Sequence, residues 1–393
     1  MNRFSRWSCL ACILFSSQQV WALDKITIAT LNQYLGVDLT PVLTATGAEA
    51  FNTALLDVLT RTAQSHFPAR VETQANAIAK YSPEIVGLQE VWFLACTDSD
   101  PTDTLGCEDP AIADAFVDYL ELTLKALTAN GSSYYPAAVV KNLDLSAGIP
   151  FFINGTGALL AAVDRDVILA RNDVDTSVVD LASNCSKPSA DGCNYQTVAS
   201  ATTPAGDIPI ERGFVAVDTV IGDRNYRIFN THLEVKGEDV GDPLFTAYQA
   251  AQASELIAMA ANTPPDRALL VIGDMNSSPV QNNIPGPLFP PFENGIITPY
   301  KQFANGEDAY GDFYDVWALR PGKVSGYTCC QSEDLTNHKT SLSERIDMIF
   351  SWEEPAKVKQ ARLLGDKVSS KTNPPGQGLW PSDHGGIAAS IEF

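Results

Sequence analysis

The sequence has few positively charged residues for its length. Its 393 residues include 26 Lys and Arg against 47 Asp and Glu, and the formal net charge is −21. Proteins that grip nucleic acid mainly through its phosphates need a basic face. The composition therefore argues against that class, although it allows a local basic groove. Repulsion between such acidic copies fits a soluble, exported protein.

Beyond its N-terminus the chain lacks an apolar run long enough to span a bilayer, so we expect no transmembrane segment. Residues 1–22 have the three parts of a signal peptide: a positive start, a short apolar stretch and a small-residue cleavage site (Arg3 and Arg6, Trp7 to Phe15, Ala22). Cleavage near Ala22 would leave residues 23–393 as one exported domain, periplasmic or extracellular. The alternative for the first stretch is a buried N-terminal strand or helix.

Cysteine is sparse, but its number in the mature chain is even. Two of the eight cysteines lie in the expected signal peptide, and six remain. An even number in an exported chain predicts disulfides, and close spacing predicts two local bridges, Cys96–Cys107 and Cys185–Cys193. A zinc site is disfavoured, because the adjacent Cys329 and Cys330 have no partner pair at ligand spacing. Those two could bridge each other or pair elsewhere.

Internal repeats and low-complexity segments are absent, and apolar runs bounded by turns extend along the whole chain. They predict β-strands at 26–31, 85–88, 158–163, 214–220, 226–230, 268–272, 346–350 and 387–391. Helix-forming stretches lie between them at 71–81, 111–129 and 245–261. Strands mixed with helices in this way favour one α/β or α+β domain. Gly222-Asp223 predicts a hairpin turn, and the polar segment 172–209 is typical of an insertion.

Polar side chains stand at or just past the ends of several predicted strands, where function gathers in open-sheet proteins. Asn32 follows the first strand, Glu90 closes the second, and His232 follows the strand at 226–230. A carboxylate among apolar residues is costly unless it is paired or metal-bound. Glu90 is therefore a candidate metal ligand or a salt-bridge partner. The alternatives are a turn residue for Asn32 and a packed or surface histidine for His232.

The C-terminal half repeats this placement. Asp274 and Asn276 follow an apolar strand and would point the same way on extended backbone, unless they form an Asx turn. Asp347 lies within another apolar run, where the alternative role is a structural salt bridge with Arg345. Ser382-Asp383-His384 precedes the last strand, as a polar turn or as part of a site. A buried Asp beside a His would orient the imidazole and raise its basicity.

Taken in order, these motifs resemble the endonuclease/exonuclease/phosphatase superfamily. That superfamily includes pancreatic-type deoxyribonucleases, apurinic endonucleases, inositol-polyphosphate 5-phosphatases and neutral sphingomyelinases. The resemblance rests on Asn32, Gln89-Glu90, Asn230-Thr231-His232, Gly273-Asp274-Met275-Asn276, Arg345-Ile346-Asp347 and Ser382-Asp383-His384. It spans nearly the whole mature chain and is specific for the superfamily, but not for a substrate.

The resemblance implies a four-layered α/β/β/α sandwich, in which two mixed β-sheets pack together between helices. It also implies that Glu90 binds a catalytic metal with Asn32 and Asp383 nearby. Mg²⁺, or Mn²⁺ or Ca²⁺ in its place, would be the cofactor. Hard cations of this kind need only one or two carboxylates plus waters and substrate oxygens.

The remaining roles follow from the same resemblance. Asp274 would activate or position the attacking water, and Asn276 would orient the phosphate. His232 and His384 would flank the phosphorus, and one of them would protonate the leaving group. Asp347 would pair with His384. These groups suit phosphoryl chemistry, which needs positioning and neutralisation of charge on the phosphate oxygens.

The substrate hypothesis is a phosphodiester of a lipid head group, or another small phosphodiester. Export and acidity fit it, and three strings look more like the sphingomyelinases than the apurinic endonucleases: Gln89-Glu90-Val91-Trp92, Glu211-Arg212-Gly213-Phe214 and Asn230-Thr231-His232-Leu233. One alternative is a secreted deoxyribonuclease-like nuclease. Another is a catalytically inactive binding protein on the same fold, which the complete residue set disfavours.

The region 279–343 carries many aromatic residues, from Phe289 and Phe292 to Phe313 and Tyr314. It sits where a member of the superfamily could carry a loop that touches a membrane or covers the substrate. The alternative, in which these rings simply pack the loop against the body of the protein, is at least as well supported.

Overall fold

The structure is a computed structural model that describes residues 24–99, 106–288, 290–306, 309–322, 324–373 and 378–393. The expected signal peptide therefore lies outside the described residues. Within them, no helix is both long and apolar enough to cross a membrane.

The first sheet is mixed and contains β1. Its strands follow the order β18 (Lys357–Leu364), β19 (Gly386–Glu392), β1 (Lys25–Asn32), β2 (Ile85–Gln89), β5 (Thr156–Arg171) and β3 (Phe93–Asp98), and β4 (Tyr134–Ile153) also pairs with β5. β1 and β2 are parallel, and the other neighbours are antiparallel.

The second sheet is also mixed, with β12 parallel to β13. Its order is β16 (Tyr314–Asp315), β17 (Asp347–Ser351), β13 (Arg267–Asp274), β12 (Arg224–His232), β11 (Gly213–Ile221), β8 (Gly192–Asn194) and β7 (Pro188–Ser189), and β6 (Thr176–Val178) also pairs with β11. Two small hairpins lie outside both sheets: β9 (Ala199–Thr203) with β10 (Gly206–Ile210), and β14 (Ile284–Pro285) with β15 (Gly295–Ile296).

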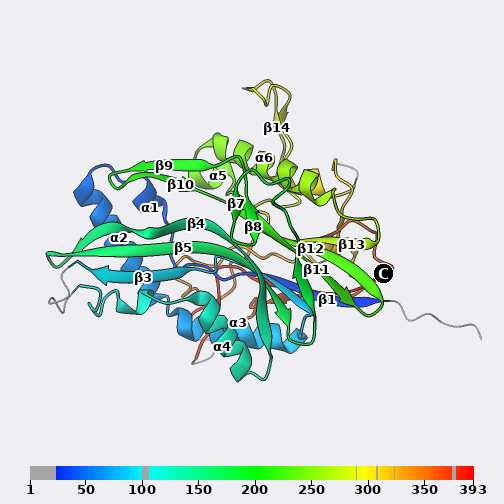
Figure 1. The fold of residues 1–393 in the computed structure, drawn as a ribbon, viewed down its shortest axis with the longest axis horizontal. Coiled ribbons are helices and arrows are strands. Elements are labelled where there is room, and N and C mark those ends of the chain that lie inside the picture. Colours follow the sequence, from blue (N-terminus) through cyan, green and yellow to red (C-terminus); the bar gives the residue numbers. More distant parts are fainter. Residues whose placement is uncertain (1–23, 100–105, 289, 307–308, 323, 374–377) are drawn as a thin grey trace, which may run out of the picture.

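Helices cover the outer faces of the two sheets (Figure 1). Those on the first sheet are α1 (Thr40–Leu43), α2 (Ala48–Gln64), α3 (Phe67–Tyr81) and α4 (Tyr119–Ala129). Those on the second are α6 (Pro243–Ala260), after the short α5 (Gly237–Val240), and α7 (Pro299–Phe303). The remaining short helices are α8 (Val316–Leu319), η1 (Ala113–Ala115) and η2 (Val368–Ser370).

Buried apolar residues form a core in each of the three spaces between layers. One cluster joins α2, α3 and α4 to the first sheet, and another joins α6 and α7 to the second. A third lies between the sheets and contains Ile28, Ile85, Val217, Ile228 and Leu270, all fully buried. Burial of apolar area drives this packing. The four-layered α/β/β/α arrangement expected from the sequence is confirmed.

Every strand predicted from the apolar runs is present, and the Gly222-Asp223 hairpin joins Ile221 to Arg224. The 20-residue strand β4 was not predicted. Its pairing with β5 shifts register at three places, one of them beside Pro136. Such bulges break the alternation by which strands are recognised. The 17-residue helix α2 was also missed.

The structure corrects one predicted helix boundary and adds strands to the polar segment 172–209. The helix expected at 111–129 begins at Tyr119, because Asp118 caps it by accepting hydrogen bonds from the backbone N–H groups of Leu120 and Glu121. Within the segment 172–209, which the sequence indicated as an insertion, β7 and β8 extend the second sheet and β9 pairs with β10.

The predicted local disulfides are present, and the Cα atoms lie 5.6 Å apart in Cys96–Cys107 and 5.8 Å apart in Cys185–Cys193. Both separations suit an unstrained bridge. The structure also pairs Cys329 with Cys330, one of the two possibilities that the sequence left open.

Replacing both Cys185 and Cys193 by alanine should lower the free energy of unfolding by roughly 2–3 kcal/mol, the loop-closure entropy of a bridge this short. Urea unfolding of the oxidised proteins measures the difference. Under reducing conditions the two proteins should unfold at similar urea concentrations, which separates the bridge from the loss of two sulfur atoms. Equal stability of the oxidised proteins would show that the bridge does not form.

Candidate active site

Strand ends from both sheets meet at one edge of the sandwich. In the first sheet, Asn32 at the end of β1 pairs with Gln89 at the end of β2. In the second, His232 at the end of β12 pairs with Asp274 at the end of β13. β17 runs the other way and begins at Asp347, opposite Asp274. The sheet register therefore brings together residues that lie far apart in the chain.

Asp274 is at the centre of this edge and is 1% exposed. Its Oδ2 atom accepts a hydrogen bond from Asn32 Nδ2 at 3.1 Å, which joins the two sheets. The same oxygen lies 3.5 Å from His232 Nε2 and 3.7 Å from His384 Nε2. Its Oδ1 atom accepts from the backbone N–H of Asn276. Two imidazoles thus converge on one carboxylate oxygen.

His384 is held as a cation by its neighbours. Its Nδ1 atom lies 2.9 Å from Asp347 Oδ2. Burial by itself would lower the pKa of His384, but attraction to Asp347, Asp383 and Asp274 outweighs burial and raises that pKa well above its ordinary value. The protonated ring therefore donates to Asp347 through Nδ1 and presents Nε2–H to the site.

His232, in contrast, is neutral. Burial, the Arg212 guanidinium and His384 together lower its pKa well below the ordinary value, so the ring is neutral. Arg212 Nη1 lies 3.0 Å from His232 Nδ1, and a guanidinium can only donate. Nδ1 therefore accepts from Arg212, while Nε2 lies 3.5 Å from Asp274 Oδ2 and 3.0 Å from Asn276 Nδ2. Two chemically identical side chains at this edge differ in charge because their partners differ.

Glu90 and Asp383 form the accessible acidic part of the site, and both side chains are half-buried. Glu90 accepts from Asn32 Nδ2 at 3.0 Å and from the backbone N–H of Leu35 at 2.9 Å. Burial, opposed by His384 and reinforced by Glu90 and Asp274, raises the pKa of Asp383 to about 7. Among the described residues no cation pairs with Glu90 within 4.0 Å, so the salt-bridge alternative for it is wrong.

This donor set fits a divalent cation. Three carboxylates, of Glu90, Asp274 and Asp383, gather here, and burial first, with Glu90 and Asp274 adding to it, raises the pKa of Asp383. Carboxylate oxygens open to water are the ligands that Mg²⁺ and Ca²⁺ prefer. Ligand atoms of Asp274, Asp347 and His384 also lie within 4.8 Å of one another, so the acidic cluster extends across the whole edge.

Unusual backbone geometry supports the site. Tyr34, Glu90 and Asn276 adopt left-handed conformations, with φ of 62°, 53° and 47°. A non-glycine residue in this region costs on the order of 1–3 kcal/mol and persists where surrounding contacts impose it. Here the side chains of Asn32 and Asp274 accept from the backbone N–H groups of Tyr34 and Asn276. The turn alternatives for both residues are therefore confirmed, and the extended backbone considered for Asp274 to Asn276 was wrong.

Hydrogen bonds or close charge interactions link all eight predicted site residues, namely Asn32, Glu90, His232, Asp274, Asn276, Asp347, Asp383 and His384. One alternative was wrong in its partner: Arg345 pairs with Asp315, at 2.5 and 3.1 Å, and not with Asp347.

Sequence reasoning missed two arginines. Arg212 lies between His232 and the carboxylates of Asp164 and Glu234, and its position just before β11 was a weak signal of its role. Arg70 is fully buried and donates to the backbone oxygens of Gln33, Tyr34 and Pro381, so it ties together two loops of the site. Arg70 lies within a helix and had no local signal.

The aromatic region behaves mainly as the packing alternative predicted. Phe303 and Phe313 are buried, and both contact Phe350 of β17, whose ring Tyr300 also meets. Tyr310 is 68% exposed. Phe289 lies outside the described residues.

Changing Asp347 to Asn should lower the pKa of His384, because the nearest negative charge is removed. In metal-free wild-type protein, NMR titration should show His384 protonated well above pH 6.5 while His232 stays neutral. The pKa of His384 is higher in the folded than in the unfolded protein. Protonated His384 therefore contributes fully to the free energy of unfolding below its unfolded pKa, and this contribution is lost as pH rises through its folded pKa. An unchanged His384 titration in the variant would contradict the pairing.

Comparison with known proteins places this geometry in a family. The family model described as "Endonuclease/Exonuclease/phosphatase family" matches residues 51–384, a span that contains every proposed site residue except Asn32. A search of curated proteins found no match.

Solved structures show the same fold. An endonuclease/exonuclease/phosphatase family protein from Bacteroides thetaiotaomicron has a TM-score of 0.51 at 13% identity, covering 95% of this chain and 99% of that one. Truncated Caenorhabditis elegans TDP2 has 0.48 at 13% identity, covering 94% and 98%. A Beutenbergia cavernae family protein has 0.46 at 16% identity, covering 94% and 72%. With the family model matching most of its length, this chain belongs to the endonuclease/exonuclease/phosphatase family.

Proposed function

We propose that this chain is an exported, divalent-metal-dependent phosphodiesterase that acts on a lipid head group, in the manner of a sphingomyelinase. Members of the family are generally metal-dependent phosphoester hydrolases. The observation that carries the proposal is the convergence of one cationic and one neutral imidazole on Asp274, beside the half-buried carboxylates of Glu90 and Asp383. Disulfides and the signal-peptide pattern support export.

Glu90 and Asp383 would hold the cation, Mg²⁺ or else Mn²⁺ or Ca²⁺, and Asn32 would keep Glu90 in place through its Nδ2–H. When bound, the metal supplies Lewis acidity to the phosphate oxygens. The Asn32 Oδ1 atom already accepts from the backbone N–H of Tyr34, and one lone pair is left for a ligand.

The chain's own residues would then perform the proton transfers. Asp274 takes a proton from the attacking water, whose oxygen bonds to phosphorus. As the bond from phosphorus to the leaving oxygen breaks, His384 gives its Nε2 proton to that oxygen, and Asp347 stabilises the cation beforehand. His232 and Asn276, whose Nε2 and Nδ2 atoms lie 3.0 Å apart, would flank the phosphoryl group and stabilise the charge that develops on its oxygens.

The lipid preference rests on charge. A net charge of −21 opposes binding of a polyanion such as DNA, whereas a zwitterionic head group carries no net repulsion. A nuclease remains the alternative outcome, to be decided by assay.

A substrate panel with Mg²⁺ should give release of phosphocholine from sphingomyelin and hydrolysis of bis-p-nitrophenyl phosphate, while plasmid DNA and inositol phosphates stay intact. EDTA should abolish both activities, and added Mg²⁺ should restore them. Plasmid nicking without lipid turnover would replace the lipid proposal with the nuclease. Absence of turnover on every substrate would favour a catalytically inactive binding protein.

Glu90→Gln should lower kcat/KM about 10²–10³-fold, because it removes the charge that would hold the cation while keeping the shape. The matched control is Glu72→Gln on the exposed face of α3, which should keep wild-type activity. Thermal unfolding of both variants checks that they are folded. Full activity of Glu90→Gln would remove the metal assignment.

A further inference from the structure

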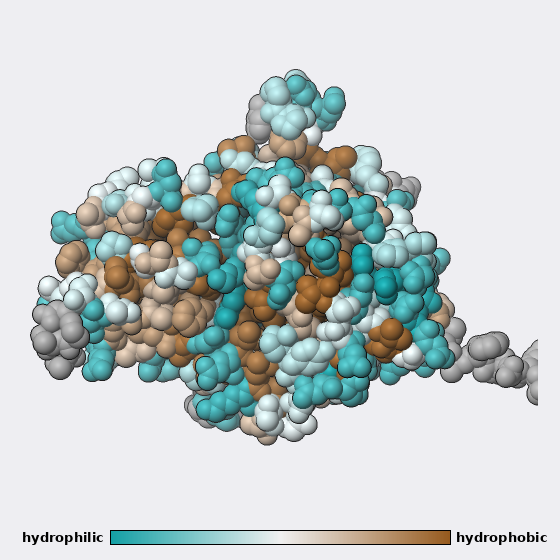
Figure 2. All heavy atoms as spheres, viewed as in Figure 1, coloured by the Kyte–Doolittle hydropathy of each residue, from teal (hydrophilic) through white to brown (hydrophobic). Residues whose placement is uncertain are grey.

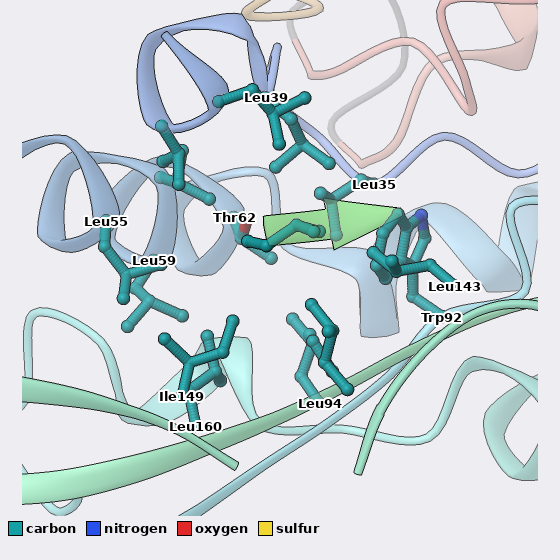
Figure 3. Close-up of a pocket in the computed structure, with 16 residues that line it drawn as sticks. Leu35, Leu39, Leu55, Leu59, Thr62, Trp92, Leu94, Leu143, Ile149 and Leu160 are labelled. Atoms are coloured by element: carbon teal, nitrogen blue, oxygen red, sulfur yellow. The ribbon is translucent and has the colours of Figure 1, made fainter. Parts of the chain in front are cut away.

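An apolar slot lies between α1 and α2 on one side and β3, β4 and β5 on the other (Figure 3). Its cavity volume is about 60 Å³. Its lining is aliphatic or aromatic apart from one threonine, Thr62. The floor is buried and includes Leu59, Leu94 and Leu160, whereas four leucines at the rim are half-buried: Leu39, Leu43, Leu143 and Leu145.

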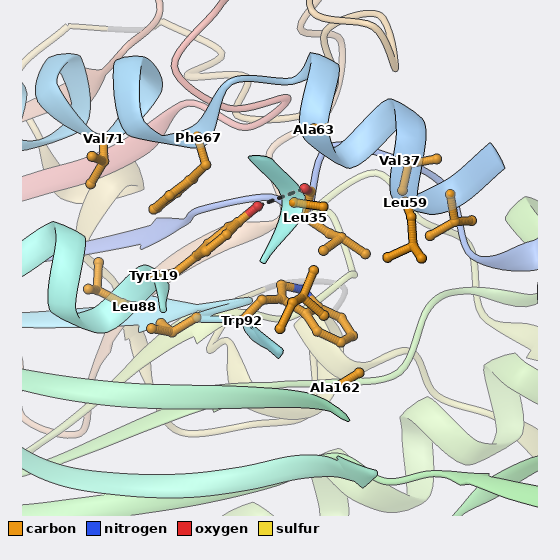
Figure 4. Packing of buried hydrophobic residues seen from close by; sticks show 14 of the residues in the cluster. Leu35, Val37, Leu59, Ala63, Phe67, Val71, Leu88, Trp92, Tyr119 and Ala162 are labelled. Atoms are coloured by element: carbon orange, nitrogen blue, oxygen red, sulfur yellow. Dashed lines mark hydrogen bonds between the residues drawn. The ribbon is translucent and has the colours of Figure 1, made fainter. Parts of the chain in front are cut away.

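The slot and the acidic site share a wall. The backbone N–H of Leu35 donates to Glu90 Oε2 at 2.9 Å, and its carbonyl accepts from Tyr119 Oη at 2.9 Å, while its side chain lines the slot (Figures 3 and 4). Trp92, two residues after Glu90, lines it as well. The slot is therefore separated from Glu90 only by the buried side chains of Leu35 and Trp92.

The slot carries features that a close-packed core does not need. Interiors normally leave few voids, and a buried donor without a partner is costly. Trp92 Nε1 and Thr62 Oγ1 are both buried without a hydrogen-bond partner among the described residues. A chain with an amide, ester or hydroxyl group near its phosphate would bring such a partner.

Exposed apolar side chains also lie near the tip of the β4–β5 hairpin. Phe152 and Leu159 are 61% and 41% exposed. Figure 2 shows hydrophobic residues gathered on this part of the molecule, over β4, β5 and α1. Both side chains alternate with the slot residues Ile149 and Leu160, so they lie on the other face of the hairpin.

We propose that the slot receives an alkyl chain of the substrate, so that the enzyme selects phosphodiesters that carry one. The inference rests on the proposed hydrolase function and narrows its substrate class.

The test uses methyl, hexyl and dodecyl p-nitrophenyl phosphates, which share one reacting bond and one leaving group. In the mature wild-type chain, kcat/KM should rise at least tenfold from the methyl to the dodecyl ester. Burial of one methylene raises kcat/KM by up to about fourfold, so two buried methylenes are enough for this increase. Ala162→Phe, which fills the slot, should flatten the series and keep the methyl ester rate. Ala161→Phe is the matched control, because the neighbouring side chain points to the other face of β5 and should preserve the series.

Leu43→Lys at the half-buried rim provides a second variant that leaves the buried floor intact, and it should also weaken the dodecyl preference. A flat series in the wild type, with the methyl ester hydrolysed, would overturn the slot and leave the proposed function standing. If no ester reacts, the proposed function fails, and a binding measurement then tests whether the slot receives an alkyl chain. A bromine-labelled dodecylphosphocholine should then quench wild-type tryptophan fluorescence, and Trp92→Phe should lose that quenching; equal quenching in both would overturn the slot.

Discussion

The side-chain amide of Asn230 joins the two sheets across the centre of the sandwich. It is fully buried, donates to the backbone oxygens of Leu88 and Val167 in the first sheet, and accepts from Gln89 Nε2 at 2.6 Å. A buried amide that lost these partners would carry a large desolvation cost. Sliding of one sheet over the other is therefore penalised, and the strand ends stay opposed. The neighbouring residues Gly87 and Asn230 pack so closely that a Cβ at Gly87 would lie 2.4 Å from Asn230 Oδ1.

Fixed strand ends impose an electrostatic arrangement that the free side chains would not adopt. Asp274 meets two imidazoles, one made cationic by Asp347 and the other kept neutral beside Arg212. Carboxylates remain in excess on the open side, where burial and mutual repulsion raise the pKa of Asp383 to about 7. An edge with this charge pattern is suited to a cation and to a phosphate whose charge grows during reaction.

The segment after β1 connects this chemistry to the apolar slot. Asn32 orients Glu90, Tyr34 takes a left-handed conformation, and the backbone of Leu35 is held by Glu90 and Tyr119. Arg70 also stabilises this segment, because its guanidinium donates hydrogen bonds to the backbone oxygens of Gln33 and Tyr34. A short turn thus places the Glu90 carboxylate next to the leucine-lined wall of the slot.

The ordered motifs indicated the family, and the local period of the apolar runs predicted the buried strands, with the candidate site residues at or near strand ends. The tertiary structure alone decided the partners. Arg345 pairs with Asp315 of the neighbouring strand and not with the nearby Asp347, and Arg212 determines the charge state of His232. The slot, too, depends on the long strand β4 and helix α2, which local patterns did not reveal. The periodicity of the sequence indicates whether a residue lies on the buried or the exposed face of its strand. Sheet register and layer packing determine which distant residue it contacts.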